Sequence, residues 1–245
     1  MRKFRLSHVG ICSLVSVLLL QSCKDDSYLT ALPPVSNQSF TEEFDTVSAA
    51  LNRGWRFINA SDPKGSSIWQ QGGSTVAPWF AAFSSNGPNV GFIGVDYLST
   101  SAQAGIISNW LVSPAVTFQN GDKISFYTRT VFDPIAGGDS TDYSNRLQLL
   151  TNNDNTLNVG FGTETGDFTP VLDINPTYIE QHTAAATYSP LAYPARWTKF
   201  EVTINGLNQP RTGRFAFRYF IEGGGSNGLG YGVGIDKVEY KSISK

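Results

Sequence analysis

Residues 109–130 read NWLVSPAVTFQNGDKISFYTRT, and this stretch decides the fold class. Two apolar runs flank Asn120-Gly121, and Asn-Gly between apolar runs is the strongest short-range signal for a β-hairpin. The second run alternates apolar Ile124 and Phe126 with polar neighbours, as a strand with one buried face does. Pro114 cannot donate a ladder hydrogen bond, so the first run begins a strand or lies at a sheet edge. The stretch predicts two paired strands of a β-sandwich.

The same alternation recurs along the chain. It predicts strands at 40–45, 54–59, 91–97, 106–111, 123–131, 145–151, 168–174, 197–204, 214–221 and 232–240. The phase slips between Ile235 and Val238, which predicts a β-bulge near Asp236-Lys237. No stretch shows three turns of amphipathic helix. We therefore expect an all-β fold in which two antiparallel sheets pack as a sandwich.

The N-terminus is typical of an exported lipoprotein. Arg2, Lys3 and Arg5 precede an apolar run at 9–20, which is too short to span a bilayer and suits a signal peptide. The run ends in Leu20-Gln21-Ser22-Cys23, which resembles a lipobox, so we predict lipid attachment at Cys23. An ordinary signal peptide with an incidental cysteine is the alternative. The predicted parts are a signal peptide at 1–22, a lipidated tether at 23–38 and one domain at 39–245.

The residues after the lipobox and the net charge bear on location and partners. Lys24-Asp25-Asp26 resembles the signal that sends some lipoproteins to the outer face of the outer membrane. Cleavage removes three of the 18 basic residues and none of the 20 acidic ones, which leaves a net charge of −5. An acidic surface without a basic stripe argues against nucleic acid as a partner. Because the lipid on Cys23 would insert into the membrane, the membrane is one predicted partner.

Most enzyme chemistry is excluded by residue type. Only His182 remains in the mature chain, with no free Cys and no G-x-S-x-G elbow. The residues that a nucleophile–base pair or a zinc site requires are therefore missing. Glycoside hydrolysis needs only two carboxylates and is the enzymatic alternative. Asp133, Asp139 and Asp142 lie in a Gly-rich loop, where Asp usually serves turn geometry. We predict that the protein is not an enzyme.

Aromatic residues in loops are the candidates for ligand binding. The connection at 175–196 is long for a structureless loop, and such loops are usually functional. Its Tyr178, Tyr188 and Tyr193, together with Trp79, are the predicted ligand-binding residues, with Trp69 and Phe80 as further aromatic platforms. Three other tryptophans stand at strand starts and are predicted to be core: Trp55, Trp110 and Trp197.

The motifs in their order resemble the choice-of-anchor J domain family. They are EEFD at 42–45, Gly54-Trp55, SNGPN at 85–89, GFIGVDY at 91–97, the stretch quoted first, NRLQLL at 145–150, GDFTPVLDIN at 166–175, GRFAFRYFIEGG at 213–224 and GVGIDKVEY at 232–240. The resemblance spans residues 40–242. It implies a jelly-roll of the galactose-binding-like or concanavalin-like architecture, related to cleaved-adhesin and MAM domains. It also implies adhesive or ligand-binding roles, without a shared catalytic centre.

The resemblance further implies a structural calcium ion, held by Glu43, Asp45 and Asp236. Ca²⁺ takes six to eight oxygens, so backbone carbonyls would supply the rest. The alternative is that Asp236 pairs with a basic residue or accepts backbone N–H groups at the bulge. Taken together, the sequence predicts a non-catalytic, surface-exposed lipoprotein of the outer membrane that binds glycan or another surface polymer. The alternatives are a protein-interaction subunit of a surface assembly and a glycoside hydrolase.

Overall fold

The computed structural model describes residues 34–72, 80–83, 91–131, 133–134, 140–141, 144–180 and 189–243, with backbone alone at 133–134 and 140–141. The chain divides into Met1–Pro34 and Val35–Lys245, and the second unit holds the fold described below. The predicted signal peptide and Cys23 lie outside the described residues. Within the described ranges, no helix is long and apolar enough to cross a membrane.

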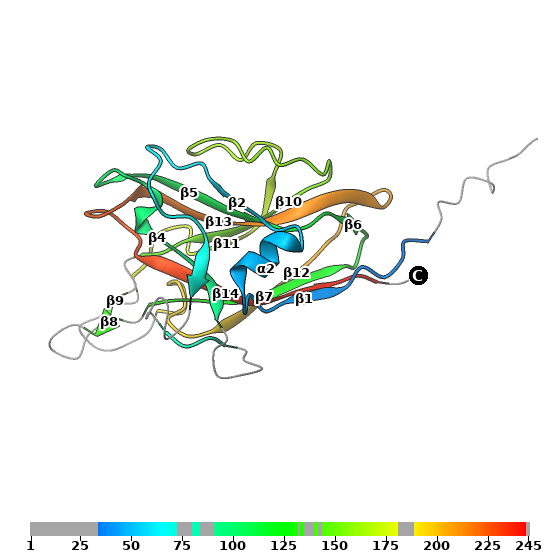
Figure 1. Ribbon diagram of the computed structural model, residues 1–245, viewed down its shortest axis with the longest axis horizontal. Coiled ribbons are helices and arrows are strands. Elements are labelled where there is room, and N and C mark those ends of the chain that lie inside the picture. The colour runs from blue at the N-terminus through cyan, green and yellow to red at the C-terminus, as the bar shows by residue number, and fades with distance from the viewer. Residues whose placement is uncertain are drawn as a thin grey trace, which may run out of the picture. The chain divides into compact units, whose positions relative to one another are not determined.

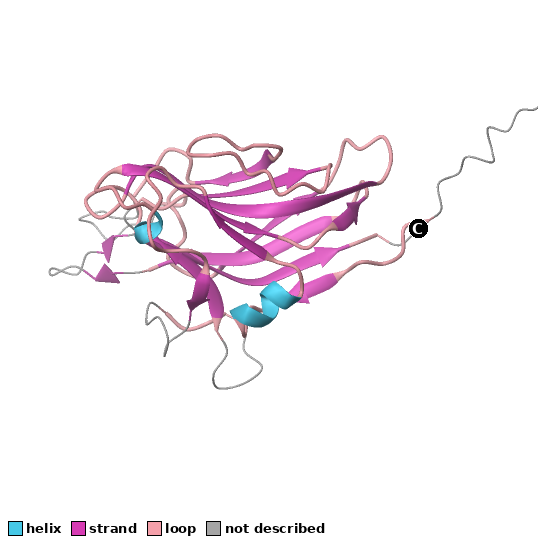
Figure 2. Cartoon of the chain, turned by 45° about the horizontal axis from the view of Figure 1, so that its top comes forward, coloured by secondary structure: helices cyan, strands magenta, loops and turns pink. Residues whose placement is uncertain are grey.

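Two antiparallel six-stranded sheets form the domain, and they lie as two layers (Figures 1 and 2). Sheet A runs β12-β7-β14-β4-β3 with β1 beside β14, and its strands are β1 (Phe40–Glu42), β3 (Gln70–Gly72), β4 (Phe92–Asp96), β7 (Lys123–Thr130), β12 (Thr198–Thr203) and β14 (Gly232–Lys241). Sheet B runs β11-β10-β13-β5-β2 with β6 beside β13, and its strands are β2 (Arg56–Asn59), β5 (Gly105–Val112), β6 (Val116–Phe118), β10 (Leu147–Asn152), β11 (Thr169–Ile174) and β13 (Arg211–Gly224).

The remaining elements are small. A helix α2 (Val47–Asn52) follows β1, a 3₁₀ turn η2 (Tyr97–Ser99) follows β4, and β8 (Asp133–Pro134) pairs with β9 (Ser140–Thr141). Every strand predicted from the sequence is present, and the predicted all-β jelly-roll sandwich is confirmed.

The core lies between the sheets because their strands alternate. Phe215, Phe217, Tyr219 and Ile221 of β13 all point inward and are fully buried. They meet inward residues of sheet A such as Phe126, whose ring lies 4.7 Å from that of Phe217. Each buried ring of this size stabilises the fold by about 1.5–3 kcal/mol.

The Asn120-Gly121 turn does not make the predicted hairpin. β6 pairs with β13 in sheet B, whereas β7 pairs with β12 and β14 in sheet A. The turn therefore carries the chain from one sheet to the other. Pro114 lies in the break between β5 and β6, in agreement with its inability to continue a ladder.

Tertiary contacts explain why the turn joins two sheets. The Asn120 side chain accepts a hydrogen bond from the Leu207 N–H and donates one to the Leu207 carbonyl. The Asp122 carboxylate accepts hydrogen bonds from the backbone N–H groups of Gln119 and Ile243, at 2.8 Å each. These bonds tie the turn to the segment after β12 and to the C-terminus. The residues of the turn were sufficient to predict a turn, but contacts with distant parts of the chain decide which strands pair.

The predicted bulge in β14 is confirmed, and it explains Asp236. The register of β14 against β7 shifts between Asp236 and Glu239, and Lys237 has φ +48°. Asp236 is fully buried, and its carboxylate accepts hydrogen bonds from the Lys237 N–H at 2.7 Å and the Phe83 N–H at 2.8 Å. The carboxylate thereby holds the segment 80–83 against the outer face of sheet A.

The tryptophan predictions are partly wrong. Trp55 and Trp110 are fully buried, as expected. Trp197 is only half-buried, because it packs on the outer face of sheet A against Phe80 and Phe92. Trp69, a predicted platform, is 1% exposed and belongs to the core between the sheets.

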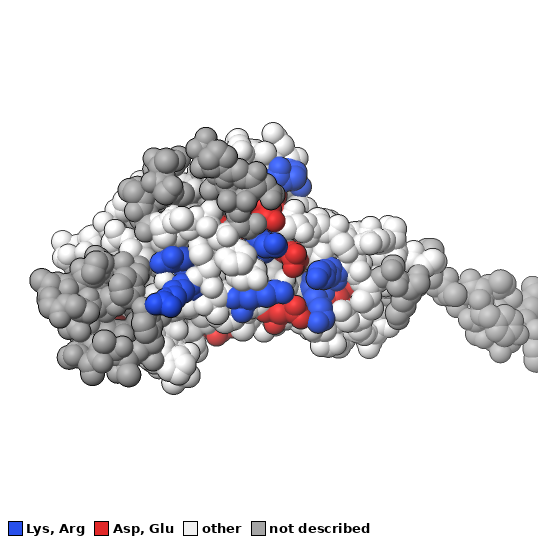
Figure 3. Space-filling model, turned by 90° about the horizontal axis from the view of Figure 1, so that it is seen from below, with Lys and Arg blue, Asp and Glu red and all other residues white. Residues whose placement is uncertain are grey.

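The outer face of sheet A carries interleaved charges (Figure 3). Lys123 forms an ion pair with Glu201 at 2.7 Å, and Lys199 lies 3.7 Å from the same carboxylate. Positive and negative side chains therefore lie side by side around β7 and β12 on this face.

Candidate functional site

The outer face of sheet B divides into a covered part and an open part. The loop at 153–168, between β10 and β11, packs Val159 and Phe168 over Trp110, Leu150 and Ala216 as a second small apolar cluster. At the ends of β10, β11 and β13 nearest the turn at 175–178, the side chains of Asp173 and Glu222 are 27% and 54% exposed. Polar side chains gather there, and they form the candidate site.

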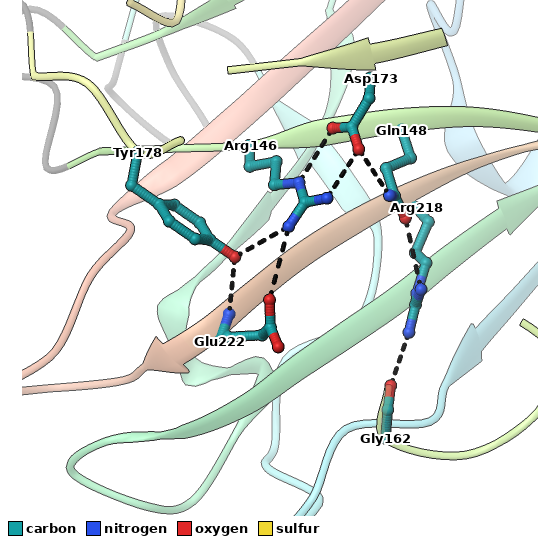
Figure 4. A network of polar contacts seen from close by, with 7 residues as sticks. All are labelled: Arg146, Gln148, Gly162, Asp173, Tyr178, Arg218 and Glu222. Atoms are coloured by element: carbon teal, nitrogen blue, oxygen red, sulfur yellow. Dashed lines mark hydrogen bonds and ion pairs between the residues drawn. The ribbon is translucent and has the colours of Figure 1, made fainter. Parts of the chain in front are cut away.

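Four residues from different elements meet at the open part (Figure 4). Arg146 directly precedes β10, Asp173 lies on β11, Glu222 lies on β13, and Tyr178 follows β11. The pairing of Gln148 with Asp173 across β10 and β11 brings the first two side chains to one face.

Arg146 is the centre of this group. Its Nε donates to Asp173 Oδ1 at 2.9 Å and its Nη2 to Asp173 Oδ2 at 2.6 Å, which is a bidentate pair. Its Nη1 donates to the Tyr178 hydroxyl at 3.1 Å and lies 3.6 Å from Glu222 Oε2. Burial lowers the pKa of Arg146, but the hydrogen bonds with Asp173 and Tyr178 outweigh that effect and raise the pKa above its ordinary value.

A second arginine stands behind the first. Arg218 is 1% exposed, and it reaches Arg146 through a relay in which its Nη1 donates to Gln148 Oε1 and Gln148 Nε2 donates to Asp173 Oδ2. Its Nη2 donates to the Gly162 carbonyl at 2.6 Å, so the covering loop is anchored to the same network. Burial, together with the charge of Arg146, lowers the pKa of Arg218 to about 9.

The ring of Phe220 forms the floor between the two guanidinium groups. The Cζ atoms of Arg146 and Arg218 lie 4.9 Å and 3.8 Å from its centroid. Cation–π contacts of this kind add roughly 0.5–2 kcal/mol each, more where water is excluded. The network is therefore held in one arrangement before any ligand arrives.

Two asparagines fix the ends of the network. Asn145, next to Arg146, is fully buried, and its Oδ1 accepts hydrogen bonds from the Tyr219 hydroxyl and the Gly232 N–H. Asn175 closes the turn that carries Tyr178, since its Oδ1 accepts from the Ile179 N–H and its Nδ2 donates to the Asn145 carbonyl. Both ends of the Arg146–Tyr178 contact are thus fixed by buried side chains.

Tyr178 is the predicted ligand-binding residue that the structure places in this site. It is half-buried, and its hydroxyl accepts hydrogen bonds from Arg146 and from the Glu222 N–H at 3.0 Å. Within the described part of the chain, no acceptor is found for its own O–H. This hydrogen remains for a ligand, whereas the ring is only partly exposed, because it packs against the core between the sheets and its centroid lies 5.6 Å from Arg146 Cζ.

Of the other predicted ligand-binding residues, Tyr193 lies away from the site, and two fall outside the described residues. Tyr193 was expected to be exposed, but it is fully buried, its hydroxyl lies 2.5 Å from Thr128 Oγ1, and burial raises its pKa. A ring with no exposed surface offers no platform, so that prediction is wrong. Tyr188 and Trp79 lie outside the described residues, as do Asp139, Asp142 and His182.

The residues predicted to bind calcium do not form a set of ligands. Asp236 uses its carboxylate on two backbone N–H groups, while Asp45 is exposed and Glu43 half-buried. In the ranges that the structure covers, no three His, Cys, Asp or Glu side chains are placed to hold a metal ion. The described structure therefore does not fit calcium at these three residues, and the alternative reading of Asp236 at the bulge is confirmed.

Comparisons with known proteins support the fold. No family model and no curated protein matches the sequence, so membership of the choice-of-anchor J family remains a prediction. Among solved structures, the K2 cleaved adhesin domain of Lys-gingipain matches with TM-score 0.50 and 16% identity over 83% of this chain and 99% of that one. The K1 cleaved adhesin domain of Lys-gingipain from Porphyromonas gingivalis W83 matches with TM-score 0.45 and 21% identity, over 84% and 98%. A xylan-binding module matches with TM-score 0.41 and 9% identity, over 86% and 99%.

At these identities the likeness concerns the fold alone. The K2 comparison shows that this chain shares the sandwich of a cleaved adhesin domain, which is the coarser part of the predicted resemblance.

Proposed function

We propose that this domain is a non-catalytic glycan-binding module, held at the outer membrane by a lipid on Cys23. The observation that carries the proposal is the half-exposed network of Arg146, Asp173, Glu222 and Tyr178 on the open part of sheet B. Sugars present hydroxyl groups and flat C–H faces. A ring beside fixed hydrogen-bonding groups matches both features, and fixed groups lose little freedom on binding.

A binding role suits the carboxylates better than a catalytic one. Both oxygens of Asp173 accept hydrogen bonds, from Arg146 and from Gln148. A glycoside hydrolase needs one carboxyl group that gives up a proton and another that attacks or activates water. Asp173 is committed to structural partners, which leaves Glu222 as the single accessible carboxylate of the network.

The test is affinity electrophoresis of the mature domain in gels that contain polysaccharides. We expect one or more polysaccharides to retard the domain, and Tyr178→Ala to abolish the retardation. The matched control is Tyr127→Ala, which removes a half-buried tyrosine from the outer face of the other sheet. Equal losses in the two variants, or no retardation by any polysaccharide, would count against the proposal. Release of reducing sugar ends during incubation would indicate a hydrolase instead.

The anchoring is tested separately. We expect the full chain to partition with outer membranes and to incorporate radiolabelled palmitate, and Cys23→Ser to remove both properties. A labelled Cys23→Ser variant would contradict lipid attachment at this residue.

A second candidate function, protein binding, is favoured by a different surface. A groove of about 410 Å³ runs beside β12, the outermost strand of sheet A, and its lining residues are Ser189, Pro190, Ala192, Pro194, Ala195, Arg196, Thr198 and Phe200. Leu191 next to it is 68% exposed. A surface subunit that co-purifies in fixed stoichiometry, and that Leu191→Asp releases while Tyr178→Ala does not, would favour this function.

A further inference from the structure

We infer that the network on sheet B takes uncharged, hydroxyl-rich sugar units and rejects acidic ones such as uronates. This inference rests on the proposed glycan-binding function and names its ligand class. It follows from which charges of the network a ligand can reach.

The positive charges are withdrawn from solvent. The Arg146 side chain is 12% exposed, and each of its three guanidinium nitrogens already has an oxygen partner. Arg218 is 1% exposed, and its nitrogens donate to Ser108 Oγ, Gln148 Oε1 and the Gly162 carbonyl. A sugar carboxylate would have to displace Asp173 from Arg146, and the displaced carboxylate would remain beside it.

The most accessible charge of the network is negative. The Glu222 side chain is 54% exposed and that of Asp173 27% exposed. Two arginines and two carboxylates balance within the network, yet a ligand approaching from solvent meets the carboxylate of Glu222 first. Like charges brought together at an interface oppose binding, so an acidic sugar is repelled where a neutral one is not.

Neutral sugars match what remains. Carboxylate oxygens accept hydrogen bonds from hydroxyl groups, and charged acceptors form the stronger bonds of this type. The O–H of Tyr178, for which no acceptor is found among the described residues, donates to a ring or hydroxyl oxygen of the sugar, and the exposed part of the Tyr178 side chain lies beside it. Among the described residues, the site thus offers the Glu222 carboxylate as acceptor, the Tyr178 hydroxyl as donor and part of an aromatic ring, while both of its arginines are paired.

The test compares neutral polysaccharides (xylan, glucomannan and mixed-linkage β-glucan) with acidic ones (polygalacturonate and alginate), using the mature domain and its Glu222→Gln and Tyr178→Ala variants. We expect at least one neutral polysaccharide to bind more than about tenfold more tightly than either acidic one. Binding should change little between about 50 and 500 mM NaCl, because no exposed charge pair is formed. Tyr178→Ala should abolish binding. Glu222→Gln should weaken binding of the neutral polysaccharide, because a neutral amide oxygen is a weaker acceptor than a carboxylate, and should narrow the ratio between the neutral and acidic affinities.

Two outcomes overturn the inference and are distinguishable. Binding of polygalacturonate or alginate that equals neutral binding, weakens with salt and disappears in Tyr178→Ala would reject the selectivity while preserving the glycan-binding function. Failure of every polysaccharide to bind would reject the function, and the selectivity with it. Melting curves of both variants establish that they are folded.

Discussion

Arg146, which directly precedes β10, is joined to Asp173 of the edge strand β11 through two parallel hydrogen bonds of 2.9 and 2.6 Å. The pair lies on the outer face of sheet B, where it is partly shielded from water by Tyr178 and Phe220. The pair therefore links the edge strand to its neighbour and also lies at the centre of the candidate site.

Removing one member of this pair should cost more than removing both. Asp173→Ala leaves the Arg146 charge poorly compensated, and we expect the free energy of unfolding to fall by about 2–4 kcal/mol. The double variant Arg146→Met with Asp173→Ala should recover part of that loss. Urea denaturation of the two single variants and the double variant gives the coupling energy. Additive losses would show that the two side chains do not act as a pair.

Lys123→Ala with Glu201→Ala, an exposed pair on the other sheet, is the control and should show a coupling below about 1 kcal/mol.

The hydroxyl and the ring of Tyr178 should have separable effects. Tyr178→Phe removes the oxygen that accepts hydrogen bonds from Arg146 and the Glu222 N–H, so we expect a stability loss of about 1–2 kcal/mol. The variant keeps the ring, so the affinity for glycan should fall by less than about tenfold, which is the effect of losing one hydrogen bond. Tyr178→Ala should abolish detectable binding. Isothermal titration with the best neutral polysaccharide distinguishes the two, and equal affinities of the two variants would show that the ring makes no contact with sugar.

Asp236 should stabilise the domain independently of calcium. Asp236→Ala removes the acceptor of the Lys237 and Phe83 N–H groups inside a fully buried site, and we expect a loss of about 1–3 kcal/mol. Melting temperatures of wild type and variant, each with calcium and with chelator, check this. A calcium ligand would make the loss depend on the metal. Asp45→Ala, which removes an exposed carboxylate, should be nearly silent in both conditions.

The strand pattern could be predicted from the sequence because it depends on local alternation, but the pairing could not. Asn120-Gly121 has the turn chemistry of a hairpin, yet contacts with Leu207 and Ile243 direct the two flanking strands into different sheets. Those partners lie far along the chain, and nothing in the local pattern marks them. The same limit explains Trp197, whose strand-start position is that of a core residue although the register places it on the outer face.

The site was accessible from the sequence only in part. Tyr178 lies in a long loop, and loop length was the signal that selected it. Asp173 and Glu222 are outward residues of strands, where a charged side chain is ordinary. Only the pairing of β10 with β11 and β13 shows that they meet around Arg146. An outward charge at the end of each of three strands is the signal that, with the pairing known, identifies them. Tyr193 lies in the same loop as Tyr178 but is buried in the core, and loop length cannot distinguish the two residues.

The sheet-crossing turn should make the domain sensitive to alkaline pH through Tyr240. Its buried hydroxyl donates to Asp122 Oδ2 at 2.5 Å, and burial, with the hydrogen bond and the charge of Asp122, raises the pKa of Tyr240 above its ordinary value of 10.0. The unfolded chain then loses this proton near pH 10 while the folded domain keeps it. The stabilisation is fully present below pH 10.0 and is lost as the pH rises toward the folded pKa.

Tyr240→Phe isolates this effect. At neutral pH the variant should lose about 1–2 kcal/mol, because the Asp122 carboxylate keeps its two backbone donors but loses the phenol. Between about pH 9 and 11 its free energy of unfolding should fall less steeply than that of wild type, since one proton-linked group is missing. Urea denaturation along this pH range measures both, with Tyr97→Phe at a half-buried tyrosine as the control. Parallel pH profiles for wild type and Tyr240→Phe would mean that the phenol titrates alike in the folded and unfolded chains. In that case the hydrogen bond between Asp122 and Tyr240 would not hold the turn against β14.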